Sequence, residues 1–190
     1  MSCANQVLTG LAKDCSTSMG GIKTVYIANY DDVTDVLMVE LDPKTKEPIK
    51  DEKDKEISTD HITKIVMADG KKFQQYSFRK GTGSMNSNLT IDAANGVNYV
   101  TTDLNLSFLK METVKRVEMA ALAVNEVVCI VEDSNGVFWY LGKDEPVTCT
   151  AGTGETGQAR GDGNKYGITL QDTSVTYPYE VDPSIIAELK

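Results

Sequence analysis

The sequence has few of the residues on which catalysis depends. Its 190 residues include one histidine and one tryptophan. The histidine, His61, lies at the edge of a charged segment beside Asp60, where a solvated imidazole is the usual state. A Ser-His-Asp or Cys-His arrangement would have to use this one side chain. We therefore predict that the protein has no catalytic residues and is not an enzyme.

The four cysteines are badly placed for binding a metal ion. No two of them have Cys-x-x-Cys spacing, and a structural zinc site would need at least three of these distant residues. The N-terminus has neither a basic region nor a sustained apolar region of the kind found in secretory signals. We expect reduced thiols and no metal. The residues concerned are Cys3, Cys15, Cys129 and Cys149.

Long apolar runs and an excess of positive charge are also missing. The longest apolar run, residues 119–124, is far short of the roughly 20 residues that span a bilayer, so no membrane partner is expected. The net charge of -9 argues against nucleic acid as a ligand, because phosphate binding needs clustered lysine and arginine. The chain is long enough for one domain with a core of its own.

Alternating apolar and polar residues fill much of the chain and predict strands. Asp-Gly or Asn-Gly pairs at 69–70, 95–96 and 135–136 are typical of tight hairpin turns. We predict a mainly β fold, an antiparallel β-sandwich or barrel with one packed α-helix at about 112–124. The predicted strands cover residues 22–29, 36–41, 62–67, 72–79, 85–91, 99–109, 126–132, 137–141, 146–151 and 165–173.

The predicted helix supplies part of the predicted core. Its apolar side chains at Val114, Val117, Ala121, Leu122 and Val124 fall on one side, which we expect to lie against a sheet. In this interpretation Val117 and Leu122 are buried. On the strand that follows, we expect the same of Val128 and Ile130.

The chain is divided into an N-terminal arm at 1–21, a β-sandwich domain at 22–176 and a C-terminal arm at 177–190. The last of these contains a short helix from Ile185, preceded by the helix-start signal Asp182-Pro183. A loop at 42–60 is dense in charges of both signs. Such a composition is typical of a mobile, solvated loop, but the segment can also order against a neighbouring subunit.

Two short motifs suggest functions that we do not adopt. Residues 152–157 fit G-x-G-x-x-G, but dinucleotide binding needs a helix directly afterwards. Residues 158–163 contain two glycines and form a poor helix, so we predict a connection between strands and no cofactor. Arg160-Gly161-Asp162 matches a cell-adhesion tripeptide, and we interpret it as a chance match.

Two stretches carry a resemblance to a known family. The first is Cys15 with residues 20–29, and the second covers residues 147–170, with turn residues such as Gly152, Gly154 and Gly157. They resemble virion structural proteins of tailed phages that infect Bacteroidetes-type bacteria. The order of elements, strands around one helix with a long loop between two early strands, is similar to that of phage tail tube proteins.

The resemblance implies a non-enzymatic, self-assembling protein of the virion tail, made in the bacterial host cytoplasm. Its partners would be copies of itself, in stacked and probably hexameric rings, and other virion proteins. DNA would pass through the channel without specific binding. The resemblance carries over no catalytic, cofactor or metal residues. Capsid decoration or head–tail connection is an alternative role, and a host-surface or carbohydrate-binding β module is an alternative from another class.

Two expectations concern assembly. The arm at 1–21 and the loop at 42–60 have too little apolar content to be held by their own domain, so we expect them to contact other copies. An acidic channel wall repels phosphate, so we expect a channel of net negative charge. Asp162 and Asp69 are the candidate residues for that wall.

Overall fold

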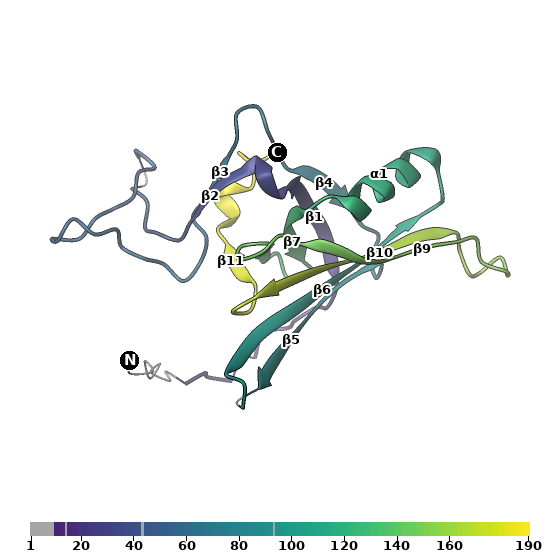
Figure 1. Ribbon diagram of the computed structural model, residues 1–190, viewed down its shortest axis with the longest axis horizontal. Coiled ribbons are helices and arrows are strands. Elements are labelled where there is room, and N and C mark those ends of the chain that lie inside the picture. The colour runs from purple at the N-terminus through teal and green to yellow at the C-terminus, as the bar shows by residue number, and fades with distance from the viewer. Residues whose placement is uncertain (1–9, 14, 43, 93) are drawn as a thin grey trace.

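The computed structural model describes residues 10–13, 15–42, 44–92 and 94–190, and they form two antiparallel sheets packed face to face (Figure 1). The predicted mainly β fold with one α-helix is confirmed. A two-stranded sheet and the helix lie beside the two large sheets. The charged segment that follows the first of the two short strands projects far from the body (Figure 1).

The five-stranded sheet has the order β11-β8-β7-β1-β4 and is antiparallel at every pairing. Its strands are β1 (Ile22–Asn29), β4 (Gln74–Ser77), β7 (Val127–Asp133), β8 (Phe138–Leu141) and β11 (Tyr179–Val181).

The four-stranded sheet has the order β5-β6-β10-β9 and is also antiparallel throughout. Its strands are β5 (Gly83–Asp92), β6 (Val97–Leu109), β9 (Thr148–Glu155) and β10 (Lys165–Ser174).

The main core fills the space between these sheets. Strands β6 and β10 alternate, so that Leu104, Leu106 and Leu170 are buried while the residues between them are not. This is the period-two pattern of a sheet with one covered face. Buried side chains of β1 and β7, such as Val25 and Val131, meet them from the five-stranded sheet.

A second core lies on the opposite face of the five-stranded sheet. Strand β7 is therefore buried on both faces, and its residues Val127, Val128, Cys129, Ile130 and Val131 are all buried. The predicted burial of Val128 and Ile130 is confirmed. The covering side chains come from distant parts of the chain and include Ile62, Ile65, Phe73, Val181, Ile186 and Leu189.

The C-terminal segment packs on this second face. The Asp182 side chain accepts a hydrogen bond from the Ser184 N–H at 2.8 Å, as its helix-start signal predicts. The short helix predicted from Ile185 is wrong, because the structure has only the 3-10 turn η2 (Pro183–Ile185) followed by further turns. Burial of Ile186 and Leu189 fixes the segment against the sheet instead.

The strand that precedes the projecting charged segment has different bounds from those predicted. The 3-10 turn η1 (Tyr30–Asp32) leads into β2 (Val33–Leu37), which pairs with β3 (Lys64–Met67). The strand predicted at 36–41 is thus shifted towards the N-terminus, because register with β3 decides its position. Between these two strands, the charged segment 38–60 bonds to itself through bridges at Val39–Ser58, Leu41–Pro48 and Lys50–Glu56.

The single helix, α1 (Thr113–Val124), falls where the sequence predicts it, but its buried face is different. Leu122 is 5% exposed and joins the main core, with Met119 packed against it. Val117 is 55% exposed, so its predicted burial is wrong. The helix has apolar side chains on two faces, and periodicity alone does not tell which of them meets the sheet.

The two faces of α1 give a matched pair of substitutions. Leu122→Ala should lower the free energy of unfolding by roughly 2–5 kcal/mol, because it leaves a cavity in the main core. Val117→Ala should change it by less than about 0.5 kcal/mol, because the side chain has little core contact to lose. Urea denaturation of the dissociated protein measures both values. Equal losses for the two variants would contradict the helix orientation.

Candidate functional site

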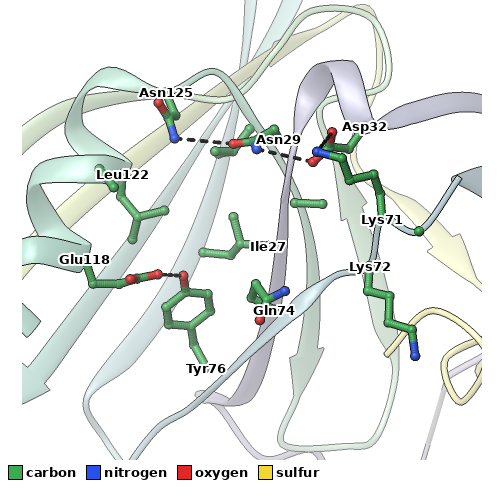
Figure 2. Close-up of a pocket in the computed structure, with 14 residues that line it drawn as sticks. Ile27, Asn29, Asp32, Lys71, Lys72, Gln74, Tyr76, Glu118, Leu122 and Asn125 are labelled. Atoms are coloured by element: carbon green, nitrogen blue, oxygen red, sulfur yellow. Dashed lines mark hydrogen bonds and ion pairs between the residues drawn. The ribbon is translucent and has the colours of Figure 1, made fainter. Parts of the chain in front are cut away.

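A pocket of about 390 Å³ lies between α1 and the strands β1 and β4 (Figure 2). Its apolar floor includes Ile27, Leu122 and Val127. Its walls are polar, and they come from the end of β1, the turn after β3, the strand β4 and one side of α1.

A chain of polar contacts crosses one end of this pocket (Figure 2). The amide of Asn125, just after α1, donates to Asn29 Oδ1 at 3.3 Å, and the Asn29 amide donates to Asp32 Oδ2 at 3.2 Å. Lys71 Nζ lies 3.0 Å from the other oxygen of Asp32. The chain ties the C-terminal end of α1 to β1 and to the turn before β4.

A second contact ties the middle of α1 to β4. The Tyr76 hydroxyl donates a hydrogen bond to Glu118 Oε1. Burial raises the pKa of this hydroxyl, and the bond to the carboxylate raises it further. Tyr76 also packs against Phe108 in an edge-on ring contact, which joins β4 to β6.

These contacts give the pocket a structural role. Its two carboxylates and two asparagine amides each have a hydrogen-bond or ion-pair partner within the pocket, and the Lys72 side chain points away from the hydrogen-bonded chain (Figure 2). Among the described lining residues there is no histidine, serine or cysteine that could act as a nucleophile or base. The arrangement holds α1 in a fixed orientation on the sheets.

The residues considered for metal binding or catalysis do not come together. His61 lies before β3, where its carbonyl accepts a hydrogen bond from the Thr59 hydroxyl at 2.7 Å. Within the described residues, no group of three or more His, Cys, Asp or Glu side chains is placed to hold a metal ion. Cys15 is exposed, whereas Cys129 is buried in β7, and burial raises the pKa of its thiol. Cys3 lies outside the described residues.

The described helices include none that is long and apolar enough to cross a membrane.

The outer face of the four-stranded sheet is mainly polar, and its charged side chains are Asp92, Asp103, Glu155 and Lys165. It consists of the residues that alternate with the core positions, and none of them is buried. Thr169 donates to Asn105 Oδ1, and the Gln171 amide donates to Asp103 Oδ1, each at 2.8 Å across β10 and β6. The face includes Ser84, Asn86, Asn88, Thr90, Asp92, Val97, Tyr99, Thr101, Asp103, Asn105, Ser107, Leu109, Thr153, Glu155, Lys165, Thr169, Gln171 and Thr173.

Both edges of this sheet lack charged side chains except at one end, because β5 ends at Asp92 and β9 ends at Glu155. Strand β5 has no charged residue at 83–91, and β9 has none at 148–154. In the described part of the chain, β5 pairs only with β6, and β9 pairs only with β10. Exposed edge strands usually have lysine, proline or a bulge that prevents pairing with another chain. Strand β9 has one register irregularity, at Thr150, and the rest of both edges lacks these devices. The two edges are therefore candidate surfaces for strand addition.

The two edges are also offset along the strand direction. Strand β5 lies beside residues 97–106 of β6, whereas β9 reaches, through β10, the level of residues 103–109. The sheet is thus a parallelogram and not a rectangle. Joining β9 of one copy to β5 of the next over their full lengths would displace the copies along the strands. A closed barrel needs such a stagger.

The glycine-rich motif has a structural explanation. Residues 152–155 belong to β9, and residues 158–163 form turns that connect β9 to β10 without a helix. Asp162 accepts hydrogen bonds from the N–H groups of Ala159 and Gln158, which lower the pKa of its carboxyl. Asp162 therefore lies at one end of the four-stranded sheet. Asp69 lies in the turn after β3, on a different part of the molecule.

Asp172 was not singled out by any sequence pattern, although its position is unusual for a carboxyl group. It is buried on the inner face of β10, and its Oδ1 accepts a hydrogen bond from the Gly142 N–H at 2.9 Å. Gly142 has φ of +93°, which favours glycine, and a Cβ there would lie 3.0 Å from Val128 Cγ1. Burial raises the pKa of Asp172 to about 6, and the charges of Asp144 and Glu145 also raise it.

Comparison of the chain with protein families, with curated proteins and with solved structures finds no match. The geometry described above therefore has to support a function by itself, together with the resemblance noted in the sequence.

Asp172 makes the stability depend on pH in a defined direction. Its pKa in the folded state is above the ordinary value of 3.8, so the folded protein binds the extra proton and stability falls as pH rises through about 6. Between pH 5 and 7.5 this one group should lower the free energy of unfolding by about 1 kcal/mol. Asp172→Asn keeps the acceptor for Gly142 and should remove that part of the decline.

The measurement is urea denaturation at pH 5, 6 and 7.5. Asp69→Asn is the matched control, because Asp69 is exposed in a turn, and it should keep the wild-type dependence on pH. A decline that is equally steep in Asp172→Asn would show that other groups cause it.

Proposed function

We propose that the protein is a non-enzymatic, self-assembling structural protein of a phage virion, and that it forms the tail tube. In this proposal the copies join side by side into rings, and the rings stack around a channel for DNA. The single observation that carries the proposal is the four-stranded sheet with two long edges that lack charge except at one end.

The strand directions support closure into a ring. Strands β5, β6, β10 and β9 alternate in direction, so the edge strands β5 and β9 run in opposite directions. In a ring of copies related by rotation, β9 of one copy would meet β5 of the next as an antiparallel pair. The sheets would form one continuous barrel, and closure removes every free edge. The offset between the two edges would supply the stagger.

The polar face of the sheet suits a channel wall. In a closed barrel this face would point to the axis, because the opposite face is covered by the five-stranded sheet. Most side chains of the face are hydroxyl or amide groups, which offer no cationic partner to phosphate, and its one lysine, Lys165, is paired with Glu155 at 3.0 Å. Asp103, at the centre of the face, and Asp92, at its end, would give each copy a net negative contribution to the channel. This agrees with a channel of net negative charge, in which Asp103 is a better candidate than Asp69.

The projecting segments suit contacts between rings. The charged segment 38–60 extends away from the body, and the described part of the N-terminal arm is exposed, with Leu11 free of contact with its own domain (Figure 1). Both segments are available to other copies. The arm is attached at its base, where the Asn135 side chain accepts a hydrogen bond from the Met19 N–H at 2.8 Å and donates one to the Met19 carbonyl at 3.1 Å.

The proposal predicts that a charge on either edge blocks assembly. Ala151→Lys on β9 and Asn88→Lys on β5 should each leave a folded monomer, because a lysine on an edge strand opposes strand addition. The matched control is Thr101→Lys on the central strand β6. Thr101 is the cross-strand neighbour of Asn88 on the same face, so the charge is equal and only the edge differs.

Negative-stain electron microscopy and sedimentation velocity give the readout, and circular dichroism checks the fold. Wild type and Thr101→Lys should form rings or tubes, and the two edge variants should not. A wild-type protein that stays monomeric would favour the binding-module alternative. Closed rings that never stack, under conditions in which tail tubes form, would favour the connector role.

A deletion tests the role of the charged loop. Removing residues 43–56 should leave the subunit folded, because Glu40 N–H already donates to the Ile57 carbonyl at 2.8 Å and holds the two ends together. Ring formation should persist and stacking into tubes should weaken. Electron microscopy distinguishes single rings from tubes. Normal tubes from the deleted protein, or an unfolded subunit, would contradict this assignment.

A further inference from the structure

Helix α1 exposes a stripe of apolar side chains, Val114, Val117, Ala121 and Val124. Val114 is 78% exposed and Val124 is 81% exposed. Positions three or four residues apart share one face of a helix, so the four side chains form a continuous line. The opposite side of the helix is the one that packs in the core through Leu122.

A second exposed apolar pair lies at the far edge of the four-stranded sheet. On β5, Leu89 is 43% exposed and Ile91 is 66% exposed. Leu89 is the cross-strand partner of the buried Val100, and Ile91 follows it by two residues. Both side chains therefore point to the inner side of the sheet, the side on which α1 also lies.

The stripe and the pair are at opposite edges of one sheet within a single copy. Helix α1 contacts β9 and β10 at one edge, and Leu89 and Ile91 belong to β5 at the other. A helix with its side chains is about 10–12 Å across, whereas neighbouring strands are about 4.8 Å apart. A helix placed over β9 is therefore wide enough for its outward side chains to reach a strand added beside β9.

We propose that the α1 stripe of one copy packs on Leu89 and Ile91 of the next copy. The inference rests on the proposed ring, in which β9 is paired with β5 of the neighbour. The offset of the edges brings the stripe and the apolar pair close together. When β9 pairs with the neighbour's β5 over its full length, the neighbour is displaced along the strands, and the half of β5 that contains Leu89 and Ile91 then lies beside β9. Each joint is then made of backbone hydrogen bonds and an apolar contact.

The orientation of α1 is fixed before assembly. The Tyr76–Glu118 hydrogen bond and the Asn125–Asn29–Asp32 chain hold the helix from two points, with its stripe outward. A preorganised surface loses less entropy on binding than a flexible one. The contact also selects the correct partner, because a strand without apolar side chains at these positions would leave the stripe uncovered.

Charge substitutions test the contact. Val117→Glu and Ile91→Glu should each raise the concentration needed for ring formation by about tenfold or more, since each removes an apolar contact and buries a charge. Ala123→Glu is the matched control, because Ala123 is exposed on a flank of α1 that lies outside the stripe. The double variant Val117→Lys with Ile91→Glu should recover part of the lost assembly, as each joint then has one charge of each sign.

A photoreactive side chain at position 117 gives an independent readout. In rings mixed from unlabelled and isotope-labelled copies, it should cross-link to a peptide of another copy that contains Leu89. A wild-type protein that forms no rings would overturn the proposed function and this inference together. Rings that form equally well from Val117→Glu and Ala123→Glu, or a cross-link to the arm near Leu11, would overturn the inference alone.

Discussion

The burial of β7 on both faces is the constraint on which the rest of the fold depends. A strand with five consecutive buried residues needs a layer on each side. The four-stranded sheet supplies one layer, and the C-terminal segment with the region around Ile62 and Phe73 supplies the other. These layers come from the middle and the C-terminal end of the chain, so distant segments must come together before β7 is covered. Among the described residues, the four-stranded sheet then has one uncovered face and two edge strands without a second partner.

The residues that stabilise one copy are different from those proposed to join copies. Hydrogen bonds and apolar contacts that involve Leu122, Tyr76 and Asn29 are satisfied within one copy. The surfaces left over are the uncharged edges, the α1 stripe and the projecting charged segment. Substitutions in the first set are expected to act on folding, and those in the second set on association. The buried Asp172 belongs to the first set, although it lies under the proposed channel wall.

Local patterns predicted most of the strands, because strand alternation is a property of neighbouring residues, and the Asn-Gly turns at 95–96 and 135–136 join paired strands as predicted. The hairpin predicted at 69–70 is wrong, because β3 pairs with β2 and β4 pairs with β1. The helix was located by its period, but Val117 and Leu122 are both apolar, and only the packing of Met119 and the bond to Tyr76 decide between their faces. The final 3-10 turn depends on burial of Ile186 and Leu189 against a distant sheet. The candidate assembly surface could not be predicted from the sequence, because it also depends on contacts between distant residues. Open edges, their offset and the position of Asp103 are facts of strand order and register, which depend on pairings between distant residues.

The uncharged edges also have a consequence for the chain before it meets its neighbours. A single copy exposes two edge strands. Their backbone N–H and C=O groups can pair with any extended segment, because backbone hydrogen bonds do not depend on the side chains. Irregular aggregation therefore competes with growth at every stage. On the edges of most soluble sheets, charged side chains prevent pairing with the wrong chain. In the proposed assembly, the offset of the edges and the helix beside them would have to prevent it instead. In the proposed assembly, addition to an existing end would be favoured over nucleation, because the complementary shape is complete only there.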